Sequence, residues 1–215
     1  MIKAVLFDMD GVLVDAKEWH FNALNQALGL FGYRIDRYDH LVTYDGLPTK
    51  RKLKMLSLDA ALPESLHGFI NDLKQNYTTE QIFKSCRPEF HIQYALSRLK
   101  QKGYKLAVCS NSIRPTVALM MQRLELADYL DLQMSNQDVK KAKPDPEIYS
   151  TAMKKLGVKP CESVVVEDNQ HGIESGRASG AHVFEVRNSS QVRLENILAF
   201  IDNLPEASCS QKKVG

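Results

Sequence analysis

The chain has 215 residues, of which 44% are hydrophobic and 25% are charged, and its formal net charge is +2. These proportions are those of an ordinary globular protein, and they exclude a disordered tail, a collagen-like rod and a disulfide-rich miniprotein. The length fits one large domain or two small ones, and the charge is too small to indicate a nucleic-acid partner.

The sequence contains no pattern typical of a membrane or secreted protein. No apolar run approaches the roughly 18–20 residues of a membrane span, and Asp8 and Asp10 interrupt any signal-peptide apolar region. The cysteines are scattered without a C-x-x-C pair, which favours core or free thiols over a disulfide framework or a zinc site. We therefore expect a cytoplasmic protein without a membrane partner, either a monomer or a weak homodimer.

Short apolar runs alternate with helical patterns over most of the chain. The first run, Ile2–Phe7, stops at acidic residues and is typical of a buried strand. Further strands are predicted over Lys105–Cys109, Leu130–Met134, Ser163–Val166 and Ala181–Val186. Apolar residues three and four positions apart predict helices over Glu89–Lys102, Thr116–Leu126, Pro146–Leu156, the segment after Asp168 through Ala178, and Gln191–Leu204.

Strands that alternate with helices form a parallel sheet covered on both faces. The expected fold is therefore α/β, with a three-layer, Rossmann-like core. The segment after the first strand breaks the alternation, because it contains only helical patterns, over Trp19–Phe31, Pro48–Leu58 and Pro63–Lys84.

We predict that residues 15–86 form an inserted, all-helical subdomain, here called the cap. Residues 1–14 and 87–204 then form the α/β domain, here called the core. An insertion that leaves and rejoins a domain at neighbouring points can move as a lid. Residues 205–215 are small and polar and are expected to form a flexible tail.

Two carboxylates follow the first predicted strand at its end. Asp8 and Asp10 are two residues apart, so in an extended chain both side chains point the same way. Open α/β sheets bind ligands beyond the carboxyl ends of their strands, and paired carboxylate oxygens favour Mg²⁺. The alternative interpretation is that this D-x-D sequence is a solvated turn.

Three further polar groups occupy comparable positions. Ser110 and Asn111 follow the second strand, where they can bind phosphate or simply cap a helix. Lys143 lies in a proline-stiffened loop, and Glu167 and Asp168 follow the fourth strand. Each alone also fits a surface lysine or a helix cap, but together they supply the carboxylate nucleophile, cation and metal ligands of phosphoryl transfer.

At these residues the sequence resembles the haloacid-dehalogenase-like (HAD) superfamily. DMDGVLVD is similar to the first motif of that family, SNS to the second, KPDPEIY to the third and VVVEDNQHGIESGRASGA to the fourth. The resemblance covers about residues 1–186, and the insertion after the first motif matches the helical cap of the beta-phosphoglucomutase-like and phosphatase branch.

The resemblance implies a role for each core residue. Asp8 would be the nucleophile that forms a phosphoaspartate, and Asp10 would protonate the leaving oxygen and then deprotonate the attacking water. Ser110 and Asn111 would hold the phosphoryl oxygens, and Lys143 would offset the negative charge. Mg²⁺ would be held by the Asp8 carboxylate, the Asp10 backbone carbonyl and Asp168, with Glu167 as a ligand or directly behind one.

Asp10 also bears on which branch of the family the chain resembles. Haloacid dehalogenases and phosphonoacetaldehyde hydrolases lack an acid at this position, so the resemblance disfavours both. Because every expected catalytic residue type is present, a non-catalytic binding protein on this fold is disfavoured too.

The cap is expected to select the substrate. His20 follows Asp15 by five residues, as does the histidine that helps gate the acid in beta-phosphoglucomutases, although it also fits a half-buried polar residue. The mutase pattern has an arginine that grips the distal phosphate, where this chain has Thr49 followed by Lys50 and Arg51 as possible substitutes. This departure weakens the mutase alternative.

The basic residues of this region have a simpler explanation as well. Lys50, Arg51, Lys52 and Lys54 are interpreted as the solvated face of one helix, because no aromatic residues are interleaved as in a nucleic-acid site. Taken together, the sequence predicts a Mg²⁺-dependent phosphomonoester hydrolase for a small phosphorylated metabolite, most plausibly a sugar phosphate, with a beta-phosphoglucomutase-like mutase as the alternative.

Overall fold

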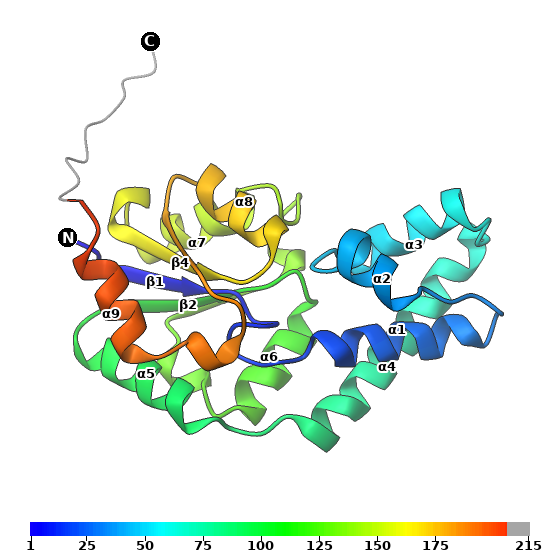
Figure 1. Cartoon of the computed structure of the whole chain (residues 1–215), viewed down its shortest axis with the longest axis horizontal. Coiled ribbons are helices and arrows are strands. Elements are labelled where there is room, and N and C mark those ends of the chain that lie inside the picture. The colour runs from blue at the N-terminus through cyan, green and yellow to red at the C-terminus, as the bar shows by residue number, and fades with distance from the viewer. Residues whose placement is uncertain (206–215) are drawn as a thin grey trace, which may run out of the picture.

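A computed structural model of the protein describes residues 1–205. Its centre is a five-stranded parallel sheet in the order β3-β2-β1-β4-β5 (Figure 1). The strands are β1 (Ala4–Phe7), β2 (Lys105–Cys109), β3 (Leu132–Met134), β4 (Ser163–Glu167) and β5 (His182–Glu185). The predicted α/β fold with a parallel sheet is confirmed.

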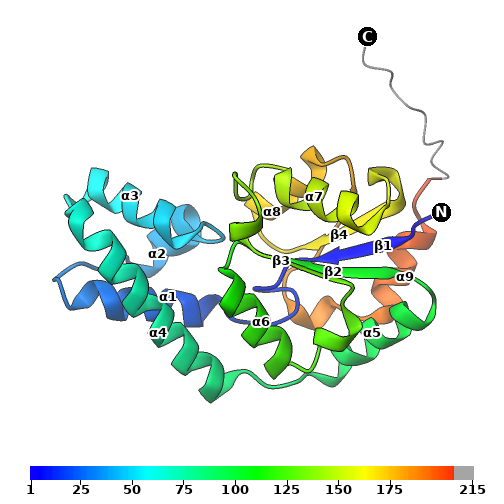
Figure 2. The same ribbon diagram turned by 180° about the vertical axis from the view of Figure 1, so that it is seen from behind.

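Helices cover both faces of this sheet (Figures 1 and 2). The first strand shows why, because Val5 and Phe7 belong to one buried cluster while Ala4 and Leu6 belong to another on the opposite face. The first cluster includes residues of α5 (Phe90–Gln101), α6 (Arg114–Arg123) and α9 (Leu194–Asp202), and the second includes residues of α7 (Glu147–Leu156). Helix α8 (Gln170–Ala178) packs against α7 and β5.

Helix α6 differs from its predicted bounds for local reasons. It begins at Arg114, two residues earlier than predicted, because Pro115 suits the first turn of a helix. It ends at Arg123, because Glu125 has a positive φ of 57° that a helix does not accommodate. Strand β3 begins only at Leu132, where the preceding Asp131 carboxylate accepts a hydrogen bond from the backbone N–H of Leu106.

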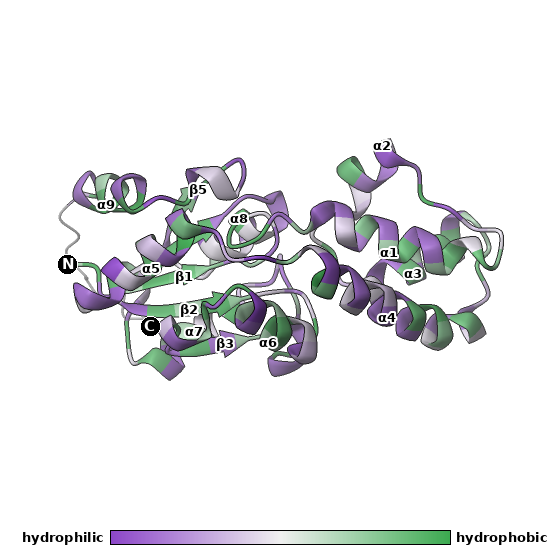
Figure 3. Cartoon of the chain, turned by 90° about the horizontal axis from the view of Figure 1, so that it is seen from below, coloured by the Kyte–Doolittle hydropathy of each residue, from purple (hydrophilic) through white to green (hydrophobic). Residues whose placement is uncertain are grey.

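The helices between residues 17 and 85 lie beyond the carboxyl end of β1 and form a separate layer (Figures 1 and 3). They are α1 (Lys17–Gly29), α2 (Arg37–Asp39), α3 (Thr49–Asp59) and α4 (His67–Ser85), with a π-helical turn over His40–Tyr44 and a 3₁₀ turn over Glu64–Leu66. They enclose a hydrophobic cluster of their own, which includes Leu24, Leu28, Leu53 and Ile70.

The helical content predicted for the cap agrees with these elements, except that α2 and the π-helical turn were not predicted. The boundaries at residues 15 and 86 stay a prediction. The predicted flexible tail, apart from Pro205, lies outside the described residues.

Cys86 and Cys109 are free and buried as expected, whereas Cys161 is disulfide-bonded, so the prediction of thiols is wrong there. In the described range 1–205, no helix combines the length and hydropathy needed to cross a membrane.

We predict that Leu96→Ala lowers the free energy of unfolding by about 2–5 kcal/mol, because Leu96 is fully buried between α5 and the sheet and its removal leaves a cavity. Chemical denaturation measures the change. Leu58→Ala is the matched control, since Leu58 is 87% exposed. Equal losses in the two variants would contradict this description of the core.

Candidate active site

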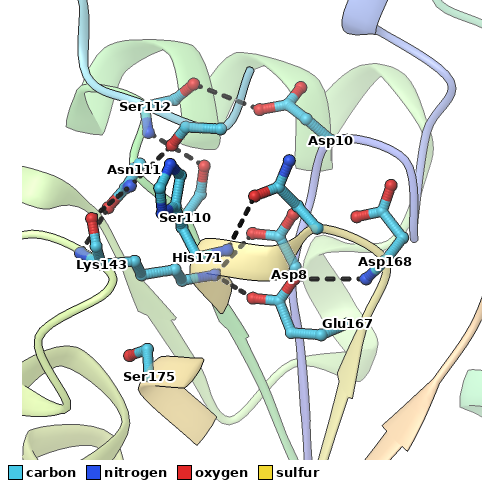
Figure 4. Close-up of polar contacts among 12 residues, drawn as sticks. Asp8, Asp10, Ser110, Asn111, Ser112, Lys143, Glu167, Asp168, His171 and Ser175 are labelled. Atoms are coloured by element: carbon cyan, nitrogen blue, oxygen red, sulfur yellow. Dashed lines mark hydrogen bonds and ion pairs between the residues drawn. The ribbon is translucent and has the colours of Figure 1, made fainter. Parts of the chain in front are cut away.

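The predicted core residues meet at the carboxyl ends of the strands (Figure 4). The backbone N–H of Asp8 donates to the carbonyl of Val166 at 3.0 Å, so this carboxylate sits directly beyond β1 and beside the end of β4. Gly11 then turns the chain with a φ of +95°, and a Cβ at this position would lie 2.0 Å from Oδ2 of Asp168. The turn therefore needs glycine both for its backbone conformation and for the close approach of Asp168.

Lys143 is buried between two carboxylates. Its Nζ lies 2.7 Å from Oδ1 of Asp8 and 2.6 Å from Oε1 of Glu167. It also donates to the hydroxyl of Tyr149 at 2.8 Å, and that hydroxyl donates to Glu167 at 2.5 Å. Asp8, Lys143, Tyr149 and Glu167 therefore form one hydrogen-bonded network. Through it, Lys143 joins the loop before α7 to the ends of β1 and β4.

Burial and mutual charge set the protonation of this network. Burial alone would lower the pKa of Lys143, but the negative charges of Asp8 and Glu167 raise it above its ordinary value. Burial, together with the charge of Asp8, raises the pKa of Glu167 to about 7. Burial also raises the pKa of Asp8, and Lys143 opposes this effect. Lys143 is therefore a permanent cation that favours the ionised form of its neighbours.

Asp168 completes an acidic cluster beside Asp8. Carboxylate oxygens of Asp8, Glu167 and Asp168 all lie within 4.8 Å of one another. Oδ2 of Asp168 pairs with Nζ of Lys17 at 2.5 Å, while its buried Oδ1 has no hydrogen-bond partner among residues 1–205. Burial and the charge of Asp8 raise the pKa of Asp168 to about 7. An orphaned carboxylate oxygen in a cluster of hard oxygen donors fits a divalent cation.

The members of this cluster are not equally available to a metal ion. Oε1 of Glu167 is occupied by Lys143 and Tyr149, and its Oε2 accepts the N–H of Asp168 at 3.3 Å. Glu167 is thus placed to hold Lys143 and to support Asp168. The carboxylate of Asp10, in contrast, lies outside the cluster, and the predicted contribution of its backbone carbonyl stays a prediction.

Asp10 instead contacts the cap. Its Oδ1 accepts a hydrogen bond from Nε2 of His20 at 3.0 Å, and Nζ of Lys74 donates to Nδ1 of the same ring at 3.1 Å. Because an ammonium only donates and a carboxylate only accepts, His20 is the neutral tautomer with its proton on Nε2. Burial would raise the pKa of Asp10, but its interactions with His20 and Lys74 hold that pKa below its ordinary value.

Ser110 and Asn111 lie where the sequence predicts, beyond β2. Ser110 is buried and its hydroxyl accepts the N–H of Ser112 at 3.0 Å. The Asn111 amide donates to the carbonyl of Gly46 at 2.8 Å, and its oxygen accepts the N–H of Lys143 at 3.1 Å. Asn111 therefore joins a cap loop to the Lys143 loop, and its predicted contact with a phosphoryl group stays a prediction.

A cavity of about 700 Å³ connects these groups with the cap. Asp8 and Asp10 line its core end, and Lys52 and Lys74 line its cap side. Lys50 lines it too, but Arg51 lines only a second pocket outside it. Of the three cap residues predicted to bind substrate, His20 and Lys50 line the main cavity and Arg51 does not.

The position of Lys52 differs from the prediction made from the sequence. It was assigned to a solvated helix face, yet only 7% of it is exposed, because it lies four residues before Leu56 and shares the buried face of α3. Lys74 was not singled out at all. It belongs to a buried stripe with Ile70 and Ile82 on α4, and the signal that could have found it is a lysine within an apolar four-residue period.

Comparisons with known proteins agree with this geometry. Residues 5–186 match the family described as haloacid dehalogenase-like hydrolase. The chain is 30% identical over 182 residues to the phosphorylated carbohydrates phosphatase of Thermotoga maritima, covering 83% of this chain and 82% of that protein. It is 28% identical over 179 residues to the phosphoglycolate phosphatase of Aquifex aeolicus, covering 83% and 82%.

The fold is also that of solved structures. A beta-phosphoglucomutase from Clostridium difficile matches with a TM-score of 0.82 and 22% identity, covering 94% of this chain and 98% of that one. CbbY from Rhodobacter sphaeroides, in complex with phosphate, matches with a TM-score of 0.76 and 24% identity, covering 86% of each chain. At these identities the likeness shows the fold alone.

We predict that, in the presence of a chelator, Asp168 contributes to the free energy of unfolding at low pH. This contribution is lost as the pH rises from about 4 to about 7. The folded pKa of about 7 lies above the ordinary 3.8, so the folded chain keeps a proton that the unfolded chain has lost over this interval. Asp168→Asn should therefore flatten the decline in stability between about pH 4 and about pH 7.

Urea denaturation at both pH values measures this difference. Asp128→Asn is the control, since Asp128 is exposed. A pH dependence in Asp168→Asn as steep as that of the unaltered protein would contradict the assignment.

Proposed function

The chain belongs to the haloacid dehalogenase-like hydrolase family, and we propose that it is a Mg²⁺-dependent phosphatase of small phosphorylated carbohydrates. The observation that carries this proposal is the position of Asp8. Asp8 is 9% exposed, lies at the core end of the cavity, is paired with Lys143 and has a carboxylate oxygen within 4.8 Å of one of Asp168. A carboxylate held in this way is placed to act as a nucleophile.

In the first step, an oxygen of Asp8 attacks the phosphorus of the bound monoester and forms a phosphoaspartate. The bond from phosphorus to the alcohol oxygen breaks, and Asp10, protonated once its contacts with His20 and Lys74 are released, gives its proton to that oxygen. Lys143 holds Oδ1 of Asp8 throughout, so the nucleophile keeps its orientation and the added negative charge is offset. Ser110 and the amide of Asn111 are proposed to donate to the phosphoryl oxygens.

In the second step, Asp10 takes a proton from water, which attacks phosphorus and releases inorganic phosphate and Asp8. The low pKa of Asp10 beside His20 favours the ionised form that serves as this base. Because His20 and Lys74 belong to α1 and α4, both contacts that hold Asp10 come from the cap. The position of the cap therefore influences when Asp10 is free to carry a proton.

The metal would be held by Asp8 and Asp168, with the Asp10 carbonyl as a further ligand and Glu167 behind them. When bound, Mg²⁺ neutralises phosphoryl oxygens and stabilises the charge of the transition state. Lys17 pairs with Oδ2 of Asp168, which leaves the unpartnered Oδ1 as the oxygen that would hold the metal ion.

The alternative is a beta-phosphoglucomutase-like mutase, and the contact between His20 and Asp10 favours it. In that reaction Asp8 passes the phosphoryl group to a second hydroxyl of a bound sugar phosphate instead of to water. The presence of Thr49, where the mutase pattern has an arginine, argues for the phosphatase. Product analysis separates the two, because a mutase gives a rearranged sugar phosphate and a phosphatase gives inorganic phosphate.

We predict that Mg²⁺ supports phosphate release from a panel of sugar phosphates and that Asp8→Asn reduces kcat by roughly 10³-fold or more, because the covalent step is lost. Asp128→Asn, an exposed carboxylate, is the control and should keep full activity. Near-normal turnover by Asp8→Asn would exclude Asp8 as the nucleophile. Conversion of glucose 1-phosphate to glucose 6-phosphate without phosphate release would identify the mutase.

We predict that Asp10→Asn retains Mg²⁺ binding while kcat falls by roughly 10²–10⁴-fold, because the predicted metal ligand at this residue is the backbone carbonyl and the lost group is the acid and base. Isothermal titration with Mg²⁺ measures the binding. Asp168→Asn serves as the comparison that should bind the metal weakly. If Asp10→Asn lost as much Mg²⁺ affinity as Asp168→Asn, the proposed roles of the two residues would be contradicted.

A further inference from the structure

A lysine of the cap reaches into the acidic cluster of the core. Lys17 is the first residue of α1, and its Nζ lies 2.5 Å from Oδ2 of Asp168. Among the described residues it is the only cation that forms an ion pair with Asp168. Asp8 and Glu167 are paired with Lys143, which belongs to the core. The cluster therefore takes one of its two positive partners from the cap.

The ammonium of Lys17 is held in place by its surroundings. Its stem passes close to Gly11, where an added Cβ would lie 2.7 Å from Cε of Lys17. Oδ2 of Asp45 lies 3.7 Å from the same Nζ, and the Asn169 amide donates to that oxygen at 2.8 Å. Gly11 thus leaves room for Lys17 as well as for Asp168, and the ammonium lies between two carboxylates.

The ion pair between Lys17 and Asp168 is largely removed from water. The side chain of Asp168 is 0% exposed and that of Lys17 is 28% exposed. Lys17 also lines the cavity that contains Asp8. Charges act on one another more strongly here than at an open surface, so the ammonium affects any ion that binds to Asp168 or enters the cavity beside it.

We propose that Lys17 shares Asp168 with the metal ion and thereby sets the charge of the loaded site. The inference rests on the metal site of the proposed function, and it gives a cap residue a role that acts through Asp168. Lys17 occupies Oδ2 and leaves Oδ1 for the metal ion. The ammonium repels a second cation at the same carboxylate, so it lowers the affinity for Mg²⁺.

The charges of the cluster predict an opposite effect on phosphate. Two ammonium groups face the three carboxylates of Asp8, Glu167 and Asp168. When these carboxylates are ionised and a divalent cation is bound, positive charge is in excess with Lys17 present and is only balanced without it. Lys17 therefore favours a phosphoryl anion beside Asp8. A side chain that merely supports the fold would not move the two affinities in opposite directions.

The first measurement is the affinity for Mg²⁺ by isothermal titration, without substrate. Lys17→Met removes the charge at similar length, and Lys17→Arg keeps it. Lys84→Met is the matched control, because Lys84 is an exposed lysine of the cap helix α4 that does not line the cavity. Lys17→Met should bind Mg²⁺ roughly tenfold more tightly than the unaltered protein, and the other two variants should match it. An equal or weaker affinity in Lys17→Met would overturn the proposal.

The second measurement is the affinity for inorganic phosphate at saturating Mg²⁺. Lys17→Met should bind phosphate roughly threefold to tenfold more weakly than the unaltered protein, because the excess positive charge is lost. Lys17→Arg should recover most of this affinity, and Lys84→Met should keep all of it. Phosphate binding that is unchanged or tighter in Lys17→Met contradicts the proposed charge balance. A loss of both affinities in that variant would indicate a structural role and overturn the proposal as well.

These titrations separate the role of Lys17 from the proposed function, because neither requires turnover. If no sugar phosphate of the panel releases phosphate, the proposed phosphatase fails, while the two affinities still decide the role of Lys17. If neither the unaltered protein nor Lys17→Met binds Mg²⁺, the inference is wrong, whatever activity is found.

Discussion

The ion pairs of Lys143 are the interaction on which the rest of the site depends. One buried ammonium lies against Asp8 beyond β1 and Glu167 at the end of β4, and it comes from the loop before α7. Two carboxylates this close would repel each other strongly in a buried environment, and Lys143 removes that penalty. Replacing it with a neutral side chain would leave the charges of Asp8 and Glu167 uncompensated. Tyr149 supports the same arrangement, because its hydroxyl satisfies both Lys143 and Glu167.

The sheet explains why so much of this site is predictable from the sequence. Asp8, Ser110 and Glu167 each come at the carboxyl end of a strand or directly after one, and parallel strands bring these ends to one edge. Local order along the chain therefore fixes the meeting point. Lys143 was predictable for a different reason, since its motif, which contains Pro144 and Pro146, resembles that of a known family. The hydroxyl contact of Tyr149 was not predicted, because its place in an apolar helical stripe gives no sign of a polar partner.

The cap shows where sequence reasoning reaches its limit. Whether Lys52 is solvated or buried depends on which face of α3 meets α4, and a four-residue period in a short basic helix does not settle that rotation. The three-residue helix α2 and the π-helical turn after it are too short to have a periodic apolar pattern. Long-range packing decides these features. The cap residues that bear on substrate choice are accordingly those that the sequence placed least well.

The cavity has ends of opposite charge, and this division gives the substrate a direction. The carboxylates of Asp8, Glu167 and Asp168 gather in the core, against the cations of Lys143 and Lys17, while the cap side contributes Lys52 and Lys74. An anion that enters without a metal ion is repelled by the acidic end and attracted to the lysine end. The cap therefore contributes positive charge to one side of the cavity, and the core contributes the groups proposed to carry the chemistry.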